Sequence, residues 1–203
     1  MRKKHKIGTI LQIIGIVLML SAAGLAVYNH FDEKRAGESA QVVLQQMEIG
    51  TPLTSEAVGE TVIPDYVLAP EMPMPTKTIS NYPYLGKIEI ESLQLSLPVI
   101  ADWSMDALRE APCCYAGSVY TDNMIIAGHN YKTHFGPLKN IALGSPVVFT
   151  DLDGNVFQYT AVDIEVLEDT AIEAMVSGDW DLTLFTCTVG GQARVAVRCE
   201  KAQ

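Results

Sequence analysis

The sequence predicts a mainly β protein, a closed or nearly closed β-barrel with short helices, preceded by an N-terminal transmembrane helix. Three observations predict this fold. A charge-free apolar run lies near the N-terminus, a proline-rich stretch follows it, and short strand-like runs separated by turn residues begin at Tyr84. A composition that is 48% hydrophobic and 19% charged is typical of a globular chain with one sizeable core.

Residues 7–27 have the character of a membrane-spanning segment, with no charged and only three polar side chains. A helix rises about 1.5 Å per residue, so about 20 residues cross a hydrocarbon layer of roughly 30 Å. Four basic residues lie within residues 1–6 and acidic residues begin at Asp32, which predicts a cytoplasmic N-terminus and an extracellular remainder. A cleaved signal peptide is the alternative, because residues 21–24 are small. The length of the apolar run favours an uncleaved anchor.

Residues 28–81 are predicted to form an extracellular tether between this anchor and a folded domain at residues 82–203. Residues 38–47 could continue the helix above the membrane. Five prolines between Pro52 and Pro75 follow, and closely spaced prolines extend a chain and cannot occupy a helix interior. The sequence therefore predicts a linker that holds the domain away from the bilayer.

The folded domain is predicted to consist mostly of short strands. Two short helices are expected at residues 102–110 and 170–176, with Asp102 and either Asp169 or Thr170 as N-caps. Asp153 and Gly154 predict a hairpin rather than a calcium loop, because the EF-hand pattern needs a third ligand before its glycine and a later glutamate. The expected strands are residues 85–90, 93–100, 124–127, 146–150, 156–164, 181–186 and 194–199.

Cys187 is the candidate nucleophile. It ends an expected strand and precedes a turn with two glycines, a setting that places a side chain at the rim of a sheet. A free thiol has a pKa of about 8.5, so a working thiol needs a nearby base or cation. A buried structural thiol or one arm of a disulfide is the alternative. The four cysteines, whose pairing the sequence leaves open, are Cys113, Cys114, Cys187 and Cys199.

His129 is the candidate acid and base. It follows an apolar strand and Gly128, whereas His134 falls in a loop. An imidazole with a pKa near 6.5 can both accept and return a proton. Arg194 opens the strand after the Cys187 turn, so a hairpin would bring this permanent cation back toward the thiol. Arg198 lies about 13 Å further along, at some 3.3 Å per residue, and is the weaker candidate.

The sequence argues against nucleic acid, metal and cofactor. Beyond the basic head, ten Lys and Arg stand against 24 Asp and Glu, a formal charge of −14. A body this acidic is repelled by phosphate backbones. The histidines and cysteines of the domain lack the close spacing that is typical of paired zinc ligands. We therefore expect no metal site and no cofactor.

At these positions the sequence resembles the sortase family. L-T-L-F-T-C-T at residues 182–188, followed by R-V-A-V-R at residues 194–198, resembles the sortase cysteine strand and the Arg-led final strand. I-I-A-G-H-N at residues 125–130 resembles the sortase histidine strand. Flanking segments match as well, and the resemblance covers residues 84–201.

The resemblance implies an eight-stranded sortase barrel at residues 82–203 and a transpeptidation. Cys187 would attack a backbone carbonyl in an LPxTG-like sorting motif near the C-terminus of a secreted protein. The resulting thioester would pass to an amine of a peptidoglycan precursor or a pilin. By the same residue matching, His129 would be the acid and base, Arg194 would orient the substrate and stabilise the oxyanion, and Thr186 would contribute to the substrate site.

Two other functions use the same residues or the same fold. A cysteine endopeptidase would deliver the acyl group to water, and an inactive barrel would only bind peptide or cell wall, with its cysteines in disulfides. The sequence features that would indicate a sortase class disagree with one another. Residues 129–131 and 134–138 are similar to class B, whereas residues 165–180 are short for the long helix that class B carries there.

Overall fold

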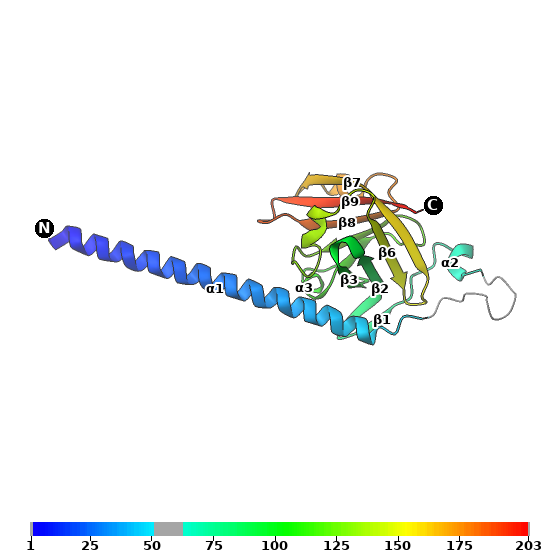
Figure 1. The fold of residues 1–203 in the computed structure, drawn as a ribbon, viewed down its shortest axis with the longest axis horizontal. Coiled ribbons are helices and arrows are strands. Elements are labelled where there is room, and N and C mark those ends of the chain that lie inside the picture. Colours follow the sequence, from blue (N-terminus) through cyan, green and yellow to red (C-terminus); the bar gives the residue numbers. More distant parts are fainter. Residues whose placement is uncertain (1, 51–62, 203) are drawn as a thin grey trace. The chain divides into compact units, whose positions relative to one another are not determined.

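The computed structural model describes residues 2–50 and 63–202 (Figure 1). Its contacts divide the chain into two units, residues 1–35 and residues 36–203. Helix α1 (Arg2–Gln46) makes up the first unit and continues into the second. By length and composition this helix can cross a membrane, a property that N-terminal signal sequences share. The part of the predicted linker at residues 51–62 lies outside the described residues.

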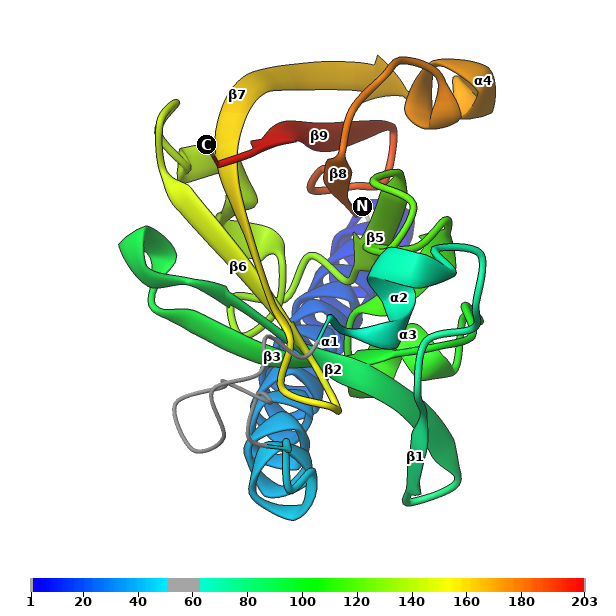
Figure 2. The same ribbon diagram turned by 90° about the vertical axis from the view of Figure 1, so that its right-hand side faces the viewer.

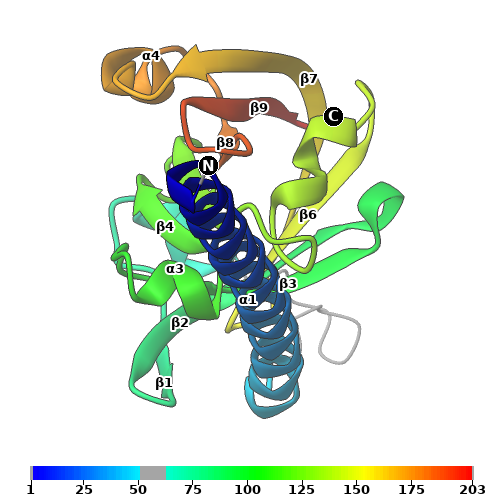
Figure 3. The same ribbon diagram turned by 90° about the vertical axis from the view of Figure 1, so that its left-hand side faces the viewer.

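The second unit is a closed β-barrel of eight strands, which confirms the predicted fold class. Its ring runs in the order β2-β3-β4-β5-β8-β9-β7-β6, and β6 pairs back onto β2 to close it (Figures 2 and 3). An additional short strand, β1, pairs with β2 outside the ring. The strands are β1 (Lys77–Ile79), β2 (Tyr82–Ile90), β3 (Leu95–Ile100), β4 (Cys113–Ala116), β5 (Met124–Gly128), β6 (Pro146–Asp151), β7 (Val156–Glu168), β8 (Leu182–Cys187) and β9 (Ala193–Lys201).

Short helices precede β1 and lie in several connections between the strands. In Figure 2, α4 follows the end of β7, which runs beside β9. Both expected helices in the domain exist but are shorter than predicted, and neither has the predicted N-cap. Asp106 precedes α3, where the Ser104 hydroxyl accepts a hydrogen bond from the Ala107 amide, and Ala171 precedes α4. The helices are α2 (Asp65–Leu68), α3 (Ala107–Glu110) and α4 (Ile172–Val176), with 3₁₀ turns η2 (Glu91–Leu93) and η3 (Gly136–Asn140).

The barrel interior is filled by alternate residues of each strand, because successive side chains of a strand point to opposite faces. In β5, β8 and β9 the inward set is fully buried and joins the main hydrophobic core. The side chains that alternate with them point away from the core and form the outer face of the barrel wall. The inward residues of these three strands are Met124, Ile126, Leu182, Leu184, Val197 and Cys199.

The predicted hairpin at Asp153 and Gly154 is confirmed. Strands β6 and β7 pair antiparallel, and Gly154 has a φ of 86°, in the left-handed region that favours glycine. The buried Asp151 carboxylate accepts hydrogen bonds from the Tyr120 hydroxyl and the Asn155 amide, each 2.8 Å long. The Asp151 carboxylate therefore links the turn between β6 and β7 to Tyr120, which precedes β5.

Part of the segment predicted as a tether packs against the barrel. Ala40, near the end of α1, is buried in the main core, and Val43 and Met47 are buried in a second cluster with residues of β1 to β4. Tyr66 of α2 stacks on Tyr120 with ring centroids 4.7 Å apart. These contacts between distant parts of the chain leave no sign in the local sequence pattern. The boundaries of anchor, tether and catalytic domain stay predictions.

Barrel closure depends on a close approach at Gly86, where β2 meets β6. A Cβ there would collide with the Thr150 carbonyl oxygen. We expect Gly86→Ala to lower the free energy of unfolding by about 3 kcal/mol or more, since backbone must move to relieve the overlap. Chemical denaturation of the full chain in detergent micelles measures this. Gly144→Ala is the matched control, because Gly144 also has a positive φ but open space around it. Equal losses in the two variants would contradict the prediction.

Candidate active site

Strand pairing brings Cys187, His129 and Arg194 to one edge of the barrel. Strands β5 and β8 run parallel with Gly128 opposite Thr186, so the next residue of each strand, His129 and Cys187, lies at the same end. Strand β9 returns antiparallel to β8, with Arg194 opposite Cys187. In the chain, His129 lies 58 residues before Cys187 and Arg194 lies seven residues after it. The pairing of the strands brings the three residues together.

These three side chains lie on the outward face of the barrel wall. Cys187 alternates with the inward residues Leu182 and Leu184, and it is exposed. His129 and Arg194 have the same parity in their strands. The thiol therefore faces away from the apolar interior, on the side where a peptide can approach it.

A cavity of about 290 Å³ lies over this outward face. Cys187, His129, Arg194 and Thr186 all line it. One wall is aromatic: Tyr115 packs edge-on against both Trp103 and Phe185, with ring centroids 5.8 and 5.5 Å apart. The lining also includes Glu168 at the end of β7 and four residues of the connection to β8, namely Asp169, Ala171, Ile172 and Met175.

Arg194 is anchored by the turn that follows Cys187. Its Nη1 donates to the carbonyl oxygens of Gly191 and Ala193, at 2.8 and 3.0 Å. The turn itself is closed by Thr188, whose amide and hydroxyl both donate to the Ala193 carbonyl. A guanidinium has five N–H donors, so this anchoring leaves Nε and Nη2 for an oxygen in the cavity.

His129 sits at the start of a tight loop that ends at Phe135. The Phe135 amide donates to the His129 carbonyl at 3.1 Å, and a Cβ at Gly128 would collide with the buried Phe135 ring. The imidazole stacks on Tyr131, with ring centroids 4.0 Å apart and planes 9° apart. Its Nδ1 accepts a hydrogen bond from the Asn130 amide. The loop and the stacked Tyr131 thus fix the plane of the ring.

Comparison with known proteins decides the family. A model of the sortase domain matches residues 88–202. The chain belongs to the sortase family. No curated protein sequence matches it significantly.

Solved sortase structures share the fold of this sortase. Sortase A from Corynebacterium diphtheriae is 19% identical with a TM-score of 0.54, and the match covers 84% of each chain. Clostridium perfringens sortase C with the C-terminal cell wall sorting motif is 20% identical with a TM-score of 0.53, covering 87% of this chain and 90% of that one. The Clostridium perfringens sortase D5 transpeptidase is 21% identical with a TM-score of 0.52, covering 59% and 79%. Because these belong to three classes, the likeness gives the fold and not the subclass.

The structure distinguishes the two candidate arginines of β9 and shows where Thr186 lies. Arg194 lies opposite Cys187 and lines the cavity, whereas Arg198 is buried and bonded elsewhere. Thr186 lines the cavity but is only 3% exposed, and its Oγ1 has no hydrogen-bond partner among the described residues. In the described part of the chain no group of three His, Cys, Asp or Glu side chains could hold a metal ion.

Sequence reasoning missed the stacking partner of the histidine and the aromatic wall. Tyr131 lies only two residues after His129, a spacing that could have pointed to it. Trp103, Tyr115 and Phe185 come from three separate parts of the chain, and no local pattern groups them.

The four thiols are free and chemically unequal. Burial raises the pKa of Cys113 and Cys199 to about 12 and that of Cys114 to about 11. A thiol with so high a pKa contains almost no thiolate at neutral pH and is inert. Cys187 is exposed beside a cation and an imidazole, so it is the thiol that can react in the folded chain.

We expect iodoacetamide to modify the folded chain at Cys187 alone at pH 8, because the thiolate is the reacting species. Peptide mapping by mass spectrometry, with denatured protein as the reference for four accessible thiols, measures this. In Cys187→Ser the rapid adduct should disappear. Comparable labelling of Cys113, Cys114 or Cys199 in the native chain would refute the assignment.

His134 is buried and contacts the same Tyr131 ring, with ring centroids 5.4 Å apart. Burial, and to a smaller extent the charge of His129, lowers the pKa of His134 to about 4. The unfolded chain binds a proton at about pH 6.5. Between these values unfolding takes up a proton, so the free energy of unfolding rises with pH across this window.

Lowering the pH from 6.5 to about 4 is therefore expected to cost roughly 3 kcal/mol of stability through this residue. His134→Phe keeps a buried ring and removes the titration. Its free energy of unfolding should depend on pH with a slope smaller by one proton in this window. Denaturant titrations of both proteins at several pH values measure the slopes, and identical slopes would show that His134 does not titrate as described.

Proposed function

We propose that this sortase is a membrane-anchored cysteine transpeptidase that acts outside the cytoplasm on secreted proteins with a C-terminal, LPxTG-like sorting motif. The observation that carries the proposal is the set of Cys187, His129 and Arg194 around one cavity, at three neighbouring strand ends. A nucleophile, a proton carrier and a fixed cation are the groups that acyl transfer needs.

Acylation would begin with transfer of the Cys187 proton to the imidazole of His129. The thiolate then attacks the carbonyl carbon of the scissile peptide bond, and the carbonyl oxygen takes the negative charge. Arg194, held by the turn carbonyls, stabilises this oxyanion and orients the peptide. The imidazolium returns its proton to the leaving nitrogen, the C–N bond breaks, and a thioester remains on Cys187.

Deacylation would run the same steps with an amine as the nucleophile. The incoming amine, from a peptidoglycan precursor or a pilin, loses a proton to His129 as it attacks the thioester. The new amide bond forms, and the thiol of Cys187 leaves with the proton. An endopeptidase would use water at this stage, so partition between amine and water separates the two functions.

The outer-face cavity supports a peptide substrate. Its aromatic and aliphatic lining, including Trp103 and Ile172, suits an apolar side chain beside the scissile bond. A related sortase C has been solved with a C-terminal cell wall sorting motif, and we assign the same class of substrate to this chain. Thr186 belongs to the substrate site in this proposal, since it precedes Cys187 and lines the cavity.

The domain plan follows from the same proposal. Residues 1–6 would lie in the cytoplasm, residues 7–27 would form the anchor, residues 28–81 would connect it to the barrel, and residues 82–203 would form the catalytic domain. Basic residues before the apolar run and acidic residues after it favour this orientation. The active site would then meet secreted proteins as they emerge at the membrane.

Incubating the full chain in detergent micelles with a sorting-motif peptide and an excess of a small amine should give the ligated peptide. We expect Cys187→Ala to lower its formation by at least about a thousandfold, because the covalent route is lost. Cys114→Ala is the control, since Cys114 does not line the cavity. Ligation that survives in Cys187→Ala would reject the proposal, and hydrolysis that dominates at saturating amine would favour the endopeptidase.

A further inference from the structure

The connection between β7 and β8 forms one wall of the cavity. It contains α4, whose residues Ile172 and Met175 line the cavity together with Ala171. Peptide bound over Cys187 would therefore lie against this helix. The position of α4 relative to β8 and β9 sets the width of the cavity.

Apolar packing holds α4 only weakly. Of its three larger apolar side chains, Ile172 is 60% and Val176 46% exposed, and only Met175, at 5%, is buried. A helix of five residues also has too few internal hydrogen bonds to be stable alone. Something other than burial must fix this wall on the barrel.

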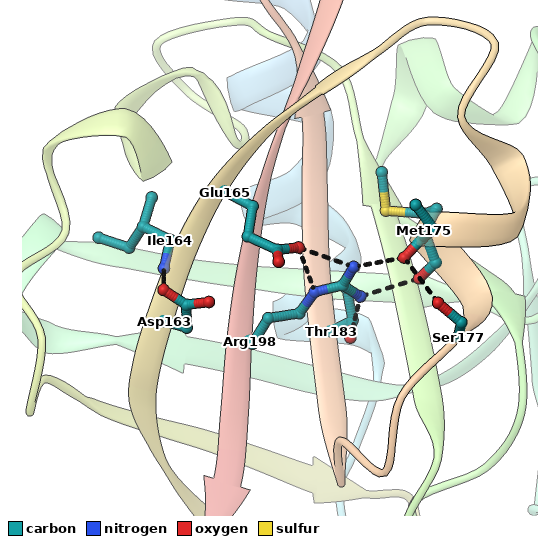
Figure 4. Close-up of polar contacts among 8 residues, drawn as sticks. Asp163, Ile164, Glu165, Met175, Ser177, Thr183 and Arg198 are labelled. Carbon is teal, nitrogen blue, oxygen red and sulfur yellow. Dashed lines mark hydrogen bonds and ion pairs between the residues drawn. The ribbon is translucent and has the colours of Figure 1, made fainter.

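Arg198 supplies the missing connection (Figure 4). Its side chain is 2% exposed. Nη2 donates to the Ala174 carbonyl at 2.7 Å and Nη1 to the Met175 carbonyl at 2.8 Å. Both carbonyls belong to the last turn of α4, where carbonyl oxygens have no hydrogen-bond partners within the helix. This end of the helix also carries the negative end of the helix dipole.

The other donors of Arg198 tie the guanidinium to the barrel. Nη1 also donates to the Thr183 hydroxyl of β8 at 3.1 Å, and Nε donates to the Glu165 carboxylate of β7 at 3.0 Å. The same carboxylate oxygen lies 3.0 Å from Nη2. One side chain of β9 thus joins β7, β8 and α4, and no shorter cation can reach all of these partners at once.

We propose that Arg198 is a positioning residue that fixes α4 as the wall of the peptide-binding cavity. It acts on substrate binding and does not touch the reacting atoms, because it lies four residues beyond Arg194 on the same face of β9, about 13 Å along the strand. This inference rests on the proposed function, since the ligand of the cavity is taken to be the sorting peptide. Loss of the guanidinium would free the wall while the thiol, imidazole and Arg194 stay in place.

Arg198→Lys tests this in the full chain, since it keeps the charge and removes the fork of donors. We expect KM for the sorting peptide to rise about tenfold with little change in kcat, the sign of lost ground-state binding. The rate of Cys187 alkylation by iodoacetamide should stay unchanged, because this small reagent needs no wall. Hydrogen exchange by mass spectrometry should speed up in residues 169–181 only. Glu165→Gln, which is tolerated at a 37% exposed carboxylate, should give a smaller change in the same direction.

Lys201→Met is the matched control. Lys201 is a cation on the same strand, but its ion pair with Asp122 is exposed, and we expect no change in any readout. An unchanged KM and unchanged exchange in Arg198→Lys would overturn the proposal, as would faster exchange throughout the barrel or a parallel loss of alkylation. If the wild type ligates no sorting peptide, the proposed function fails, whereas the exchange of residues 169–181 still decides whether Arg198 fixes the wall.

Discussion

The parallel ladder between β5 and β8 is the constraint on which the site depends. Parallel neighbours end at the same edge of a sheet, so the residue that follows β5 and the residue that ends β8 meet there without any direct link. Had these strands been antiparallel, His129 and Cys187 would lie at opposite ends of the ladder. The antiparallel return of β9 adds Arg194 at the same edge. Chain direction alone thus assembles an imidazole, a thiol and a guanidinium at one edge of the barrel.

The alternation of side chains along each strand then determines which cysteine is exposed and which is buried. Cys199 lies opposite Leu182 with inward parity, in the core, and burial raises its pKa to about 12. Cys187 lies opposite Arg194 with outward parity and is exposed. The two cysteines belong to adjacent strands and differ in reactivity because of the face that each occupies. The core is complete without the site residues, so the outer wall can carry a reactive thiol without opening the interior.

Much of this arrangement was predictable from local sequence. Alternation located seven of the strands near their observed positions, and strand-end positions pointed to Cys187, His129 and Arg194. Strand β4 was missed because Cys-Cys-Tyr-Ala is too short to show a period, and its pairing with β5 contains a bulge after Cys114. The packing of Ala40 and Val43 on the barrel was missed because contacts between residues far apart in the chain have no local signal. The aromatic wall and the partners of Arg198 depend on register between distant strands for the same reason.

The two arginines of β9 use their guanidinium groups in a similar way, although only Arg194 lines the cavity. Each lies on the outer face of the strand, and each donates to carbonyl oxygens of a neighbouring segment: Arg194 to the turn after Cys187, and Arg198 to the end of α4. A guanidinium can do this because it provides several donors in one plane. Arg194, which is half-buried, uses only Nη1 in these bonds, whereas the buried Arg198 uses Nε, Nη1 and Nη2 within the protein. Strand β9 therefore bonds both the turn that follows Cys187 and the end of α4.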